Sequence, residues 1–135
     1  MRAVLDPNVI ISALLTPAGT PAAIVRAWST GAFELVASPL LLAELERALA
    51  YPKLRTRVHE TEATAVVEWL GRSASIVPDP GEPAPRGSAD PGDDYLIALA
   101  AHEHAALVSG DRHLLELATE LPIYPPADFL ALLDP

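Results

Sequence analysis

The sequence predicts an α/β fold, a three-layer α/β/α sandwich in which helices cover both faces of a mainly parallel sheet. Short apolar runs alternate with longer amphipathic segments along a chain of 135 residues. Three of the longer segments open with a capping residue followed by proline, which is typical of a helix start. Because domains cluster near about 100–150 residues, we expect residues 1–135 to form one domain.

The first elements follow from a compact apolar run and a proline-marked helix start. Arg2–Asp6 is apolar up to a terminal carboxylate and is predicted as a buried strand. Asn8–Leu15 follows at once and is predicted as a helix. Thr20 is then expected to cap a helix over Ala22–Ser29, and Gly31 to close it.

The next elements repeat the same order. Phe33–Ala37 is predicted as a second strand, and Ser38 caps a helix expected over Pro39–Ala50. Tyr51–Val58 is interpreted as a basic connection. Glu60–Arg72 has the spacing of an amphipathic helix.

A long loop separates the two halves of the predicted sheet. Ser75–Val77 is expected to form a short strand, and Pro78–Gly92 is rich in proline and glycine without any periodic pattern. Long loops in compact domains are usually functional or mobile. Asp90 then caps a helix expected from Pro91 to about His104.

The last elements complete the alternation. Ala105–Ser109 is predicted as a strand, Arg112–Leu117 as a short helix, Ile123–Tyr124 as an edge strand and Ala127–Leu133 as a closing helix. In parallel sheets of this kind, ligands bind at the carboxyl ends of the strands. Functional residues are therefore expected where these strands end.

Composition narrows the classes of function. Nine basic against 18 acidic residues give a formal charge of −9, which opposes broad adhesion to DNA or anionic lipid. The same charge permits an enzyme that approaches a phosphodiester through bound cations. The sequence contains no cysteine, which excludes a disulfide scaffold, a thiolate zinc site and a cysteine nucleophile.

The sequence also bears on location. Asp6 places a carboxylate where a signal peptide would need an unbroken apolar run. No stretch reaches the roughly 18 uncharged apolar residues of a membrane span. We therefore expect a cytoplasmic protein without a membrane segment.

Two carboxylates are expected at strand ends. Asp6 follows the first strand, and Asp111 follows Ser109 and Gly110 just beyond the fourth. Each could face the same crevice and hold a hard divalent cation, which prefers anchored oxygens. Each could equally cap the helix that follows it, and either acid alone leaves both interpretations open.

Other acids lie on helices. Asp93 and Asp94, with Asp90 nearby, crowd one helix start, where the helix dipole favours them and where a bound cation would offset their repulsion. Glu44 and Glu46 border the apolar face of the helix Pro39–Ala50. Periodicity does not choose between these two glutamates, and either could be an ordinary solvated charge.

The ordered set of motifs resembles the PIN domains, in particular bacterial toxin components of toxin–antitoxin systems of the VapC type. The segments that carry this resemblance are Val4–Leu14, Phe33–Pro39, Glu44–Leu45, Pro52–Leu54, Asp90–Asp93 and Val108–Asp111. Each segment alone is common, but their order and spacing are specific. The resemblance covers nearly the whole chain.

The resemblance implies a set of roles for individual residues. The acidic residues that would bind metal and carry catalysis are Asp6, Glu44, Asp93 and Asp111. Asp94 ranks behind Asp93 as a ligand, and Asn8 and Ser109 would orient the acids.

Three positions depart from the usual family pattern. Pro7 replaces a usual threonine, while Gly92 and His113 replace residues that are often acidic. Pro7 removes a hydroxyl and a backbone N–H near the expected site. The four principal acids remain, so we do not infer inactivity.

The resemblance implies an endoribonuclease. In such an enzyme, water activated by Mg²⁺ or Mn²⁺ hydrolyses the phosphodiester bonds of RNA. Oxygen ligands suit these ions better than zinc. A small basic group, Arg47, Lys53, Arg55 and Arg57, could contact the RNA backbone or simply be a solvated turn. A cognate antitoxin and a homodimer are the partners that the family implies.

Two alternatives belong to other classes. One is a PIN-like interaction module that binds a protein partner with little or no catalysis, which metal-dependent cleavage by the isolated chain would distinguish. The other is a phosphatase with Asp6 as nucleophile. That mechanism usually has a second acid two positions later, where this chain has Asn8.

Overall fold

The computed structural model describes residues 1–133 and shows a five-stranded sheet with strand order β3-β2-β1-β4-β5. The strands are β1 (Arg2–Leu5), β2 (Glu34–Ala37), β3 (Ser75–Ile76), β4 (Ala106–Val108) and β5 (Ile123–Tyr124). All four pairings are parallel, with Leu5 opposite Val108 in the central pair. The predicted α/β fold with a parallel sheet is confirmed.

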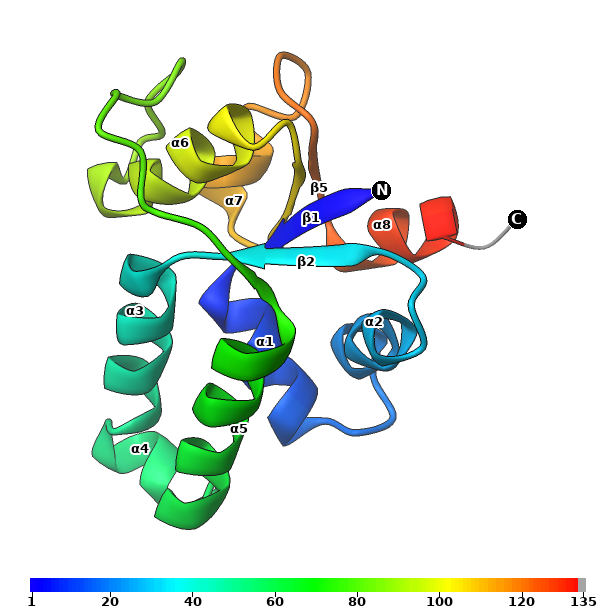
Figure 1. The fold of residues 1–135 in the computed structure, drawn as a ribbon, viewed down its shortest axis with the longest axis vertical. Coiled ribbons are helices and arrows are strands. Elements are labelled where there is room, and N and C mark those ends of the chain that lie inside the picture. Colours follow the sequence, from blue (N-terminus) through cyan, green and yellow to red (C-terminus); the bar gives the residue numbers. More distant parts are fainter. Residues whose placement is uncertain (134–135) are drawn as a thin grey trace.

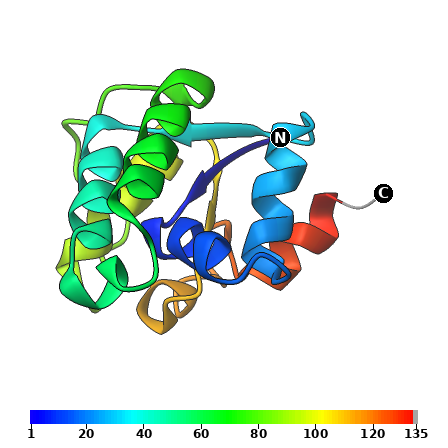
Figure 2. The same cartoon turned by 90° about the horizontal axis from the view of Figure 1, so that it is seen from below.

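Helices cover both faces of this sheet. The helices are α1 (Pro7–Leu15), α2 (Thr20–Ser29), α3 (Pro39–Leu49), α4 (Pro52–Arg55), α5 (Glu60–Ser73), the 3₁₀ turn η1 (Pro91–Asp93), α6 (Asp94–His102), α7 (Arg112–Leu115) and α8 (Pro126–Leu133). Figure 1 shows α6 and α7 on one side of β1 and β2, and α1, α2, α3 and α5 on the other. Figure 2, seen from below, shows α1 between α2 and α3.

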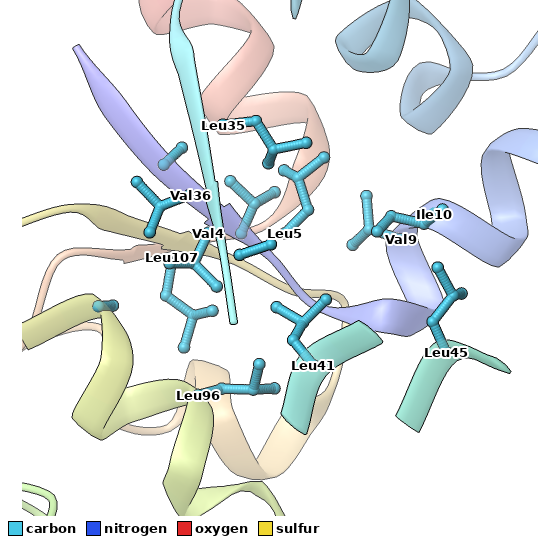
Figure 3. Close-up of a cluster of buried hydrophobic side chains, with 14 of the residues drawn as sticks. Val4, Leu5, Val9, Ile10, Leu35, Val36, Leu41, Leu45, Leu96 and Leu107 are labelled. Atoms are coloured by element: carbon cyan, nitrogen blue, oxygen red, sulfur yellow. The ribbon is translucent and has the colours of Figure 1, made fainter. Parts of the chain in front are cut away.

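The core lies between the sheet and these helices. Figure 3 shows side chains of β1 and β2 meeting those of α1, α3 and α6. Leu5, Leu41 and Leu96 are each no more than 1% exposed. Burying a leucine side chain contributes roughly 1.5–3 kcal/mol, so this contact holds the helices that border the carboxyl ends of the strands.

Several boundaries differ from the sequence prediction. Thr20 is not the cap of α2: the cap position is Gly19, without a side-chain hydrogen bond. The expected connection Tyr51–Val58 contains the short helix α4, and the helix expected from Pro91 divides into η1 and α6. Gly31, with φ of +88°, closes the α2 region as expected, since that backbone region favours glycine.

Within residues 1–133, no single helix is long and apolar enough to cross a membrane. The helices α1 and α2 reach that length and composition only together, and a bend of 103° separates them.

Candidate active site

The candidate site lies where the strand order reverses. From β1 the chain continues to β2 and β3 on one side, and it later returns to place β4 and β5 on the other. Such a switch point opens a crevice at the carboxyl ends of the two central strands. Asp6 follows β1, and Ser109–Asp111 follow β4, so both segments lie at this crevice.

Asp6 is held rigidly at the end of β1. Its side chain is buried, with 4% of the residue exposed. Oδ1 accepts a hydrogen bond from the Asn8 backbone N–H at 3.0 Å, and Oδ2 accepts one from Ser109 Oγ at 2.7 Å. Burial raises the pKa of Asp6, while these two hydrogen bonds oppose the rise. Asp6 therefore caps α1 and is bound to the segment that follows β4 at the same time.

Ser109 links the two strand ends. Its hydroxyl donates to Asp6 and accepts the Asp111 backbone N–H at 3.0 Å. The Oδ1 atom of Asp111 accepts the His113 backbone N–H at 2.8 Å, which caps α7. Both strand-end acids are therefore oriented by hydrogen bonds on at least one oxygen.

Asp93 joins these two acids from the start of α6. Burial, a hydrogen bond with Asp111 and the negative charge of Asp6 raise the pKa of Asp93 to about 7. Burial is the largest of these causes, and the neighbouring carboxylates add to it because like charges disfavour the ionised form. Asp6, Asp93 and Asp111 therefore form one group, the carboxylate cluster.

Glu44 reaches the edge of the carboxylate cluster from α3. Its negative charge contributes to the raised pKa of Asp6, yet its carboxylate is paired with Arg47 on the same helix. Glu46 is exposed and instead lines a pocket of about 290 Å³ between α3, α4 and α5. Of the two glutamates that periodicity left open, Glu44 is the one beside the cluster.

Two expected residues have different partners. Asp94 accepts the Ser88 backbone N–H at 2.8 Å, so its carboxylate fastens the long loop to the start of α6. Asn8 acts on Asp6 through its backbone N–H, and its residue is exposed. Among residues 1–133, the Asn8 side chain makes no hydrogen bond that would orient Asp6.

Sequence reasoning missed two residues near the site. Asp79, in the long loop, accepts the Leu40 backbone N–H at 2.9 Å and so caps the helix that carries Glu44. Tyr95 has a buried hydroxyl without a hydrogen bond among the described residues. Burial raises the pKa of Tyr95, followed by the charges of Glu44, Asp6, Asp93 and Asp79. Asp79 lies 39 positions from Leu40, and no local pattern signals that pairing.

Three of the four expected RNA-binding residues, Arg47, Lys53 and Arg57, are exposed, and their contact with RNA stays a prediction. Arg47 is paired with Glu44. Arg55 is half-buried and lines the pocket with Glu46, while Lys53 and Arg57 are exposed.

The chemistry of the carboxylate cluster suits a hard divalent cation. Among residues 1–133, none of its three acids has an ion-pair partner within 4 Å. Burial is the largest cause of the raised pKa of Asp93, and the negative charges of Asp6 and Asp111 add to it. As the side chains of these residues stand, no three acids or histidines are close enough to hold a metal ion. The donors fit Mg²⁺ or Mn²⁺ in type and charge, and binding would require side chains to rotate.

The fold defines the class, an α/β protein of the PIN type. Residues 2–113 match the PIN domain family model, and the chain belongs to that family, which confirms the resemblance seen in the sequence. PIN domains are in general nucleases that use divalent metals.

Comparison with known proteins adds relatives of this fold. An uncharacterized protein of Methanocaldococcus jannaschii, MJ1680, is 28% identical over 120 residues, which are 89% of this chain and 77% of that protein. VapBC2 from Rickettsia felis, solved with a DNA fragment from its promoter, has a TM-score of 0.64 and 13% identity over 91% of this chain and 97% of its own.

Two further solved structures agree. PAE2754 from Pyrobaculum aerophilum has a TM-score of 0.65 and 18% identity, covering 98% of this chain and 89% of its own. FitAcB from Neisseria gonorrhoeae has a TM-score of 0.62 and 19% identity, covering 93% of this chain and 98% of its own. At these identities the likeness shows the fold alone.

Proposed function

We propose that this PIN domain, taken as residues 1–135, is a metal-dependent endoribonuclease and the toxin component of a toxin–antitoxin pair. The observation that supports the proposal is that Asp6 and Asp111 follow neighbouring strands at the switch point, with Asp93 near enough for their charges to raise its pKa. Among the described residues, none of the three acids has a cationic partner within 4 Å. Glu44 would complete the ligand set from α3.

The residues of the chain divide the work. Asp6 is a fixed anchor, because Ser109 and the Asn8 N–H hold its two oxygens. Asp93 would hold the cation in its ionised form, because a positive charge nearby would lower its raised pKa. Bound Mg²⁺ or Mn²⁺ would supply positive charge that activates water and stabilises charge on the phosphoryl oxygens. No side-chain nucleophile is required.

The partners in the proposal come from the family and its relatives. An RNA substrate, a cognate antitoxin and a homodimer are what VapC-type proteins imply, and VapBC2 and FitAcB share the fold. The acidic character of the chain, with a formal charge of −9, favours a basic segment in such an antitoxin.

Cleavage of RNA by variants of the carboxylate cluster tests the activity. We expect Asp6→Asn or Asp111→Asn to lower Mg²⁺- or Mn²⁺-dependent cleavage by at least roughly 100-fold, because each change removes a charged ligand. Asp128→Asn is the matched control, since Asp128 is exposed in the first turn of α8. Circular dichroism checks that the fold is retained.

Two results would count against the proposal. Cleavage that survives in both Asp6→Asn and Asp111→Asn would contradict the assigned mechanism. A pure unaltered protein that cleaves no RNA with either ion would favour the interaction module instead.

A further inference from the structure

The pairing of Glu44 with Arg47 sets this acid apart from the others. The two residues lie three positions apart on α3, a spacing that brings side chains together on one side of a helix. Among residues 1–133, Glu44 is the one acid of the proposed ligand set with an ion-pair partner within 4 Å. The Arg47 guanidinium group thus occupies the Glu44 carboxylate, which is a proposed metal ligand.

The ion pair between Glu44 and Arg47 can break readily because both side chains are exposed to solvent. The side chain of Arg47 is 65% exposed and that of Glu44 is 38% exposed. Exposed ion pairs contribute little because water and salt screen them. A divalent cation, attracted also by the carboxylate cluster, can therefore displace Arg47 at a small cost in affinity.

Building on the proposed function, we propose that Arg47 competes with the divalent cation for Glu44 and so sets the metal affinity of the site. In the metal-free protein Arg47 neutralises the charge of Glu44 and occupies its carboxylate. When the cation binds, Glu44 changes partner and Arg47 is released to solvent.

Calorimetric titration of Mn²⁺ tests this competition without any reaction. We expect Arg47→Gln to tighten Mn²⁺ binding roughly threefold, the size that loss of an exposed ion pair allows. Arg72→Gln is the control, because Arg72 is exposed on α5 and removal of its charge leaves the pair intact. Thermal unfolding verifies that both variants are folded.

A double-variant cycle separates the pair from a general effect of charge. In a Glu44→Gln background, Arg47→Gln should leave the Mn²⁺ affinity unchanged, because the competed carboxylate is gone. Equal tightening in both backgrounds, or no tightening in either, overturns the competition.

The two proposals fail in different ways. If Asp6→Asn weakens Mn²⁺ binding while Arg47→Gln leaves it unchanged, the competition is wrong and the proposed site stands. If the unaltered protein binds no Mn²⁺, both proposals fall.

Discussion

The strand-end acids and the helix-borne acid differ in how they are held. Asp6 is buried and fixed by two hydrogen bonds, whereas Glu44 is partly exposed and paired with the exposed side chain of Arg47. Strand ends in the core present a side chain in one orientation, while the surface of a helix leaves several rotamers open. Under the proposed function, Asp6 and Asp111 form a prearranged half of the site, and Glu44 belongs to a half that a metal ion would have to recruit.

The largest effect expected from this difference is on the affinity for Mn²⁺. We expect Asp6→Asn to weaken Mn²⁺ binding by at least about 100-fold, since changing a residue that merely supports a ligand already costs roughly 10- to 100-fold. Glu44→Gln should cost only about 10-fold, because its carboxylate has first to leave Arg47. Calorimetry measures both, with Glu46→Gln as control; equal losses would show that the two halves are equally prearranged.

Stability tests the rigid half directly. Ser109→Ala removes the hydroxyl that donates to Asp6 and accepts from Asp111, and so leaves buried polar groups without partners. We expect a loss of about 2 kcal/mol in the free energy of unfolding. Urea denaturation measures it, and Ser12→Ala, at an exposed position of α1, should change little. A loss at Ser109 no larger than that of the control would mean that the link is not stabilising.

The sequence anticipated the rigid half better than the recruited one. Alternating apolar runs predicted every strand to within a residue or two at either end, and strand ends placed Asp6 and Asp111 at one crevice. The four residues of α4 show no helical period, so that helix was missed. The pairing of Glu44 with Arg47 is a rotamer choice, which residue order does not record.

Longer-range contacts were also beyond a pattern in the sequence. The Asp79 cap on α3 depends on the path of the long loop, which has no periodic signal. Asn8 stood at the expected position, but the backbone rather than the side chain makes the bond to Asp6. Residue identity indicated where polar contacts would be, and the folded backbone decided which atoms make them.

A pH series sharpens the comparison within the carboxylate cluster. Asp93 titrates near 7 in the folded metal-free protein and near 4 when unfolded, so the folded state binds more protons between these values. Stability should therefore fall as pH rises from about 4 to about 7. Asp93→Asn should flatten this fall by about 1 kcal/mol, a figure reduced for the exposed part of the group.

Urea denaturation at pH 5 and pH 8 with a chelator measures the effect, with Asp94→Asn as the neighbouring control. If the free energy of unfolding falls equally between pH 5 and pH 8 in Asp93→Asn and in the unaltered protein, the pKa of Asp93 is not raised by folding.

The smallest expected effect concerns the recruited half. Asp79→Ala removes one hydrogen bond to the first turn of α3, whose N-cap Ser38 remains, and should lower the free energy of unfolding by about 0.5 kcal/mol. Chemical denaturation measures the loss against Asp128→Ala. If the Asp79→Ala variant were more stable than the unaltered protein, partial burial of this carboxylate would destabilise the fold by more than its hydrogen bond to Leu40 stabilises it.

The bond between Asp6 and Ser109 joins positions 103 residues apart. Contacts of such separation form late, because most of the chain has to be present and ordered before they can close. During synthesis Asp6 is made early, but its carboxylate lacks the bond to Ser109 until β4 has also been made. The orientation of this carboxylate is therefore complete only when β4, the strand that precedes Ser109, has paired with β1.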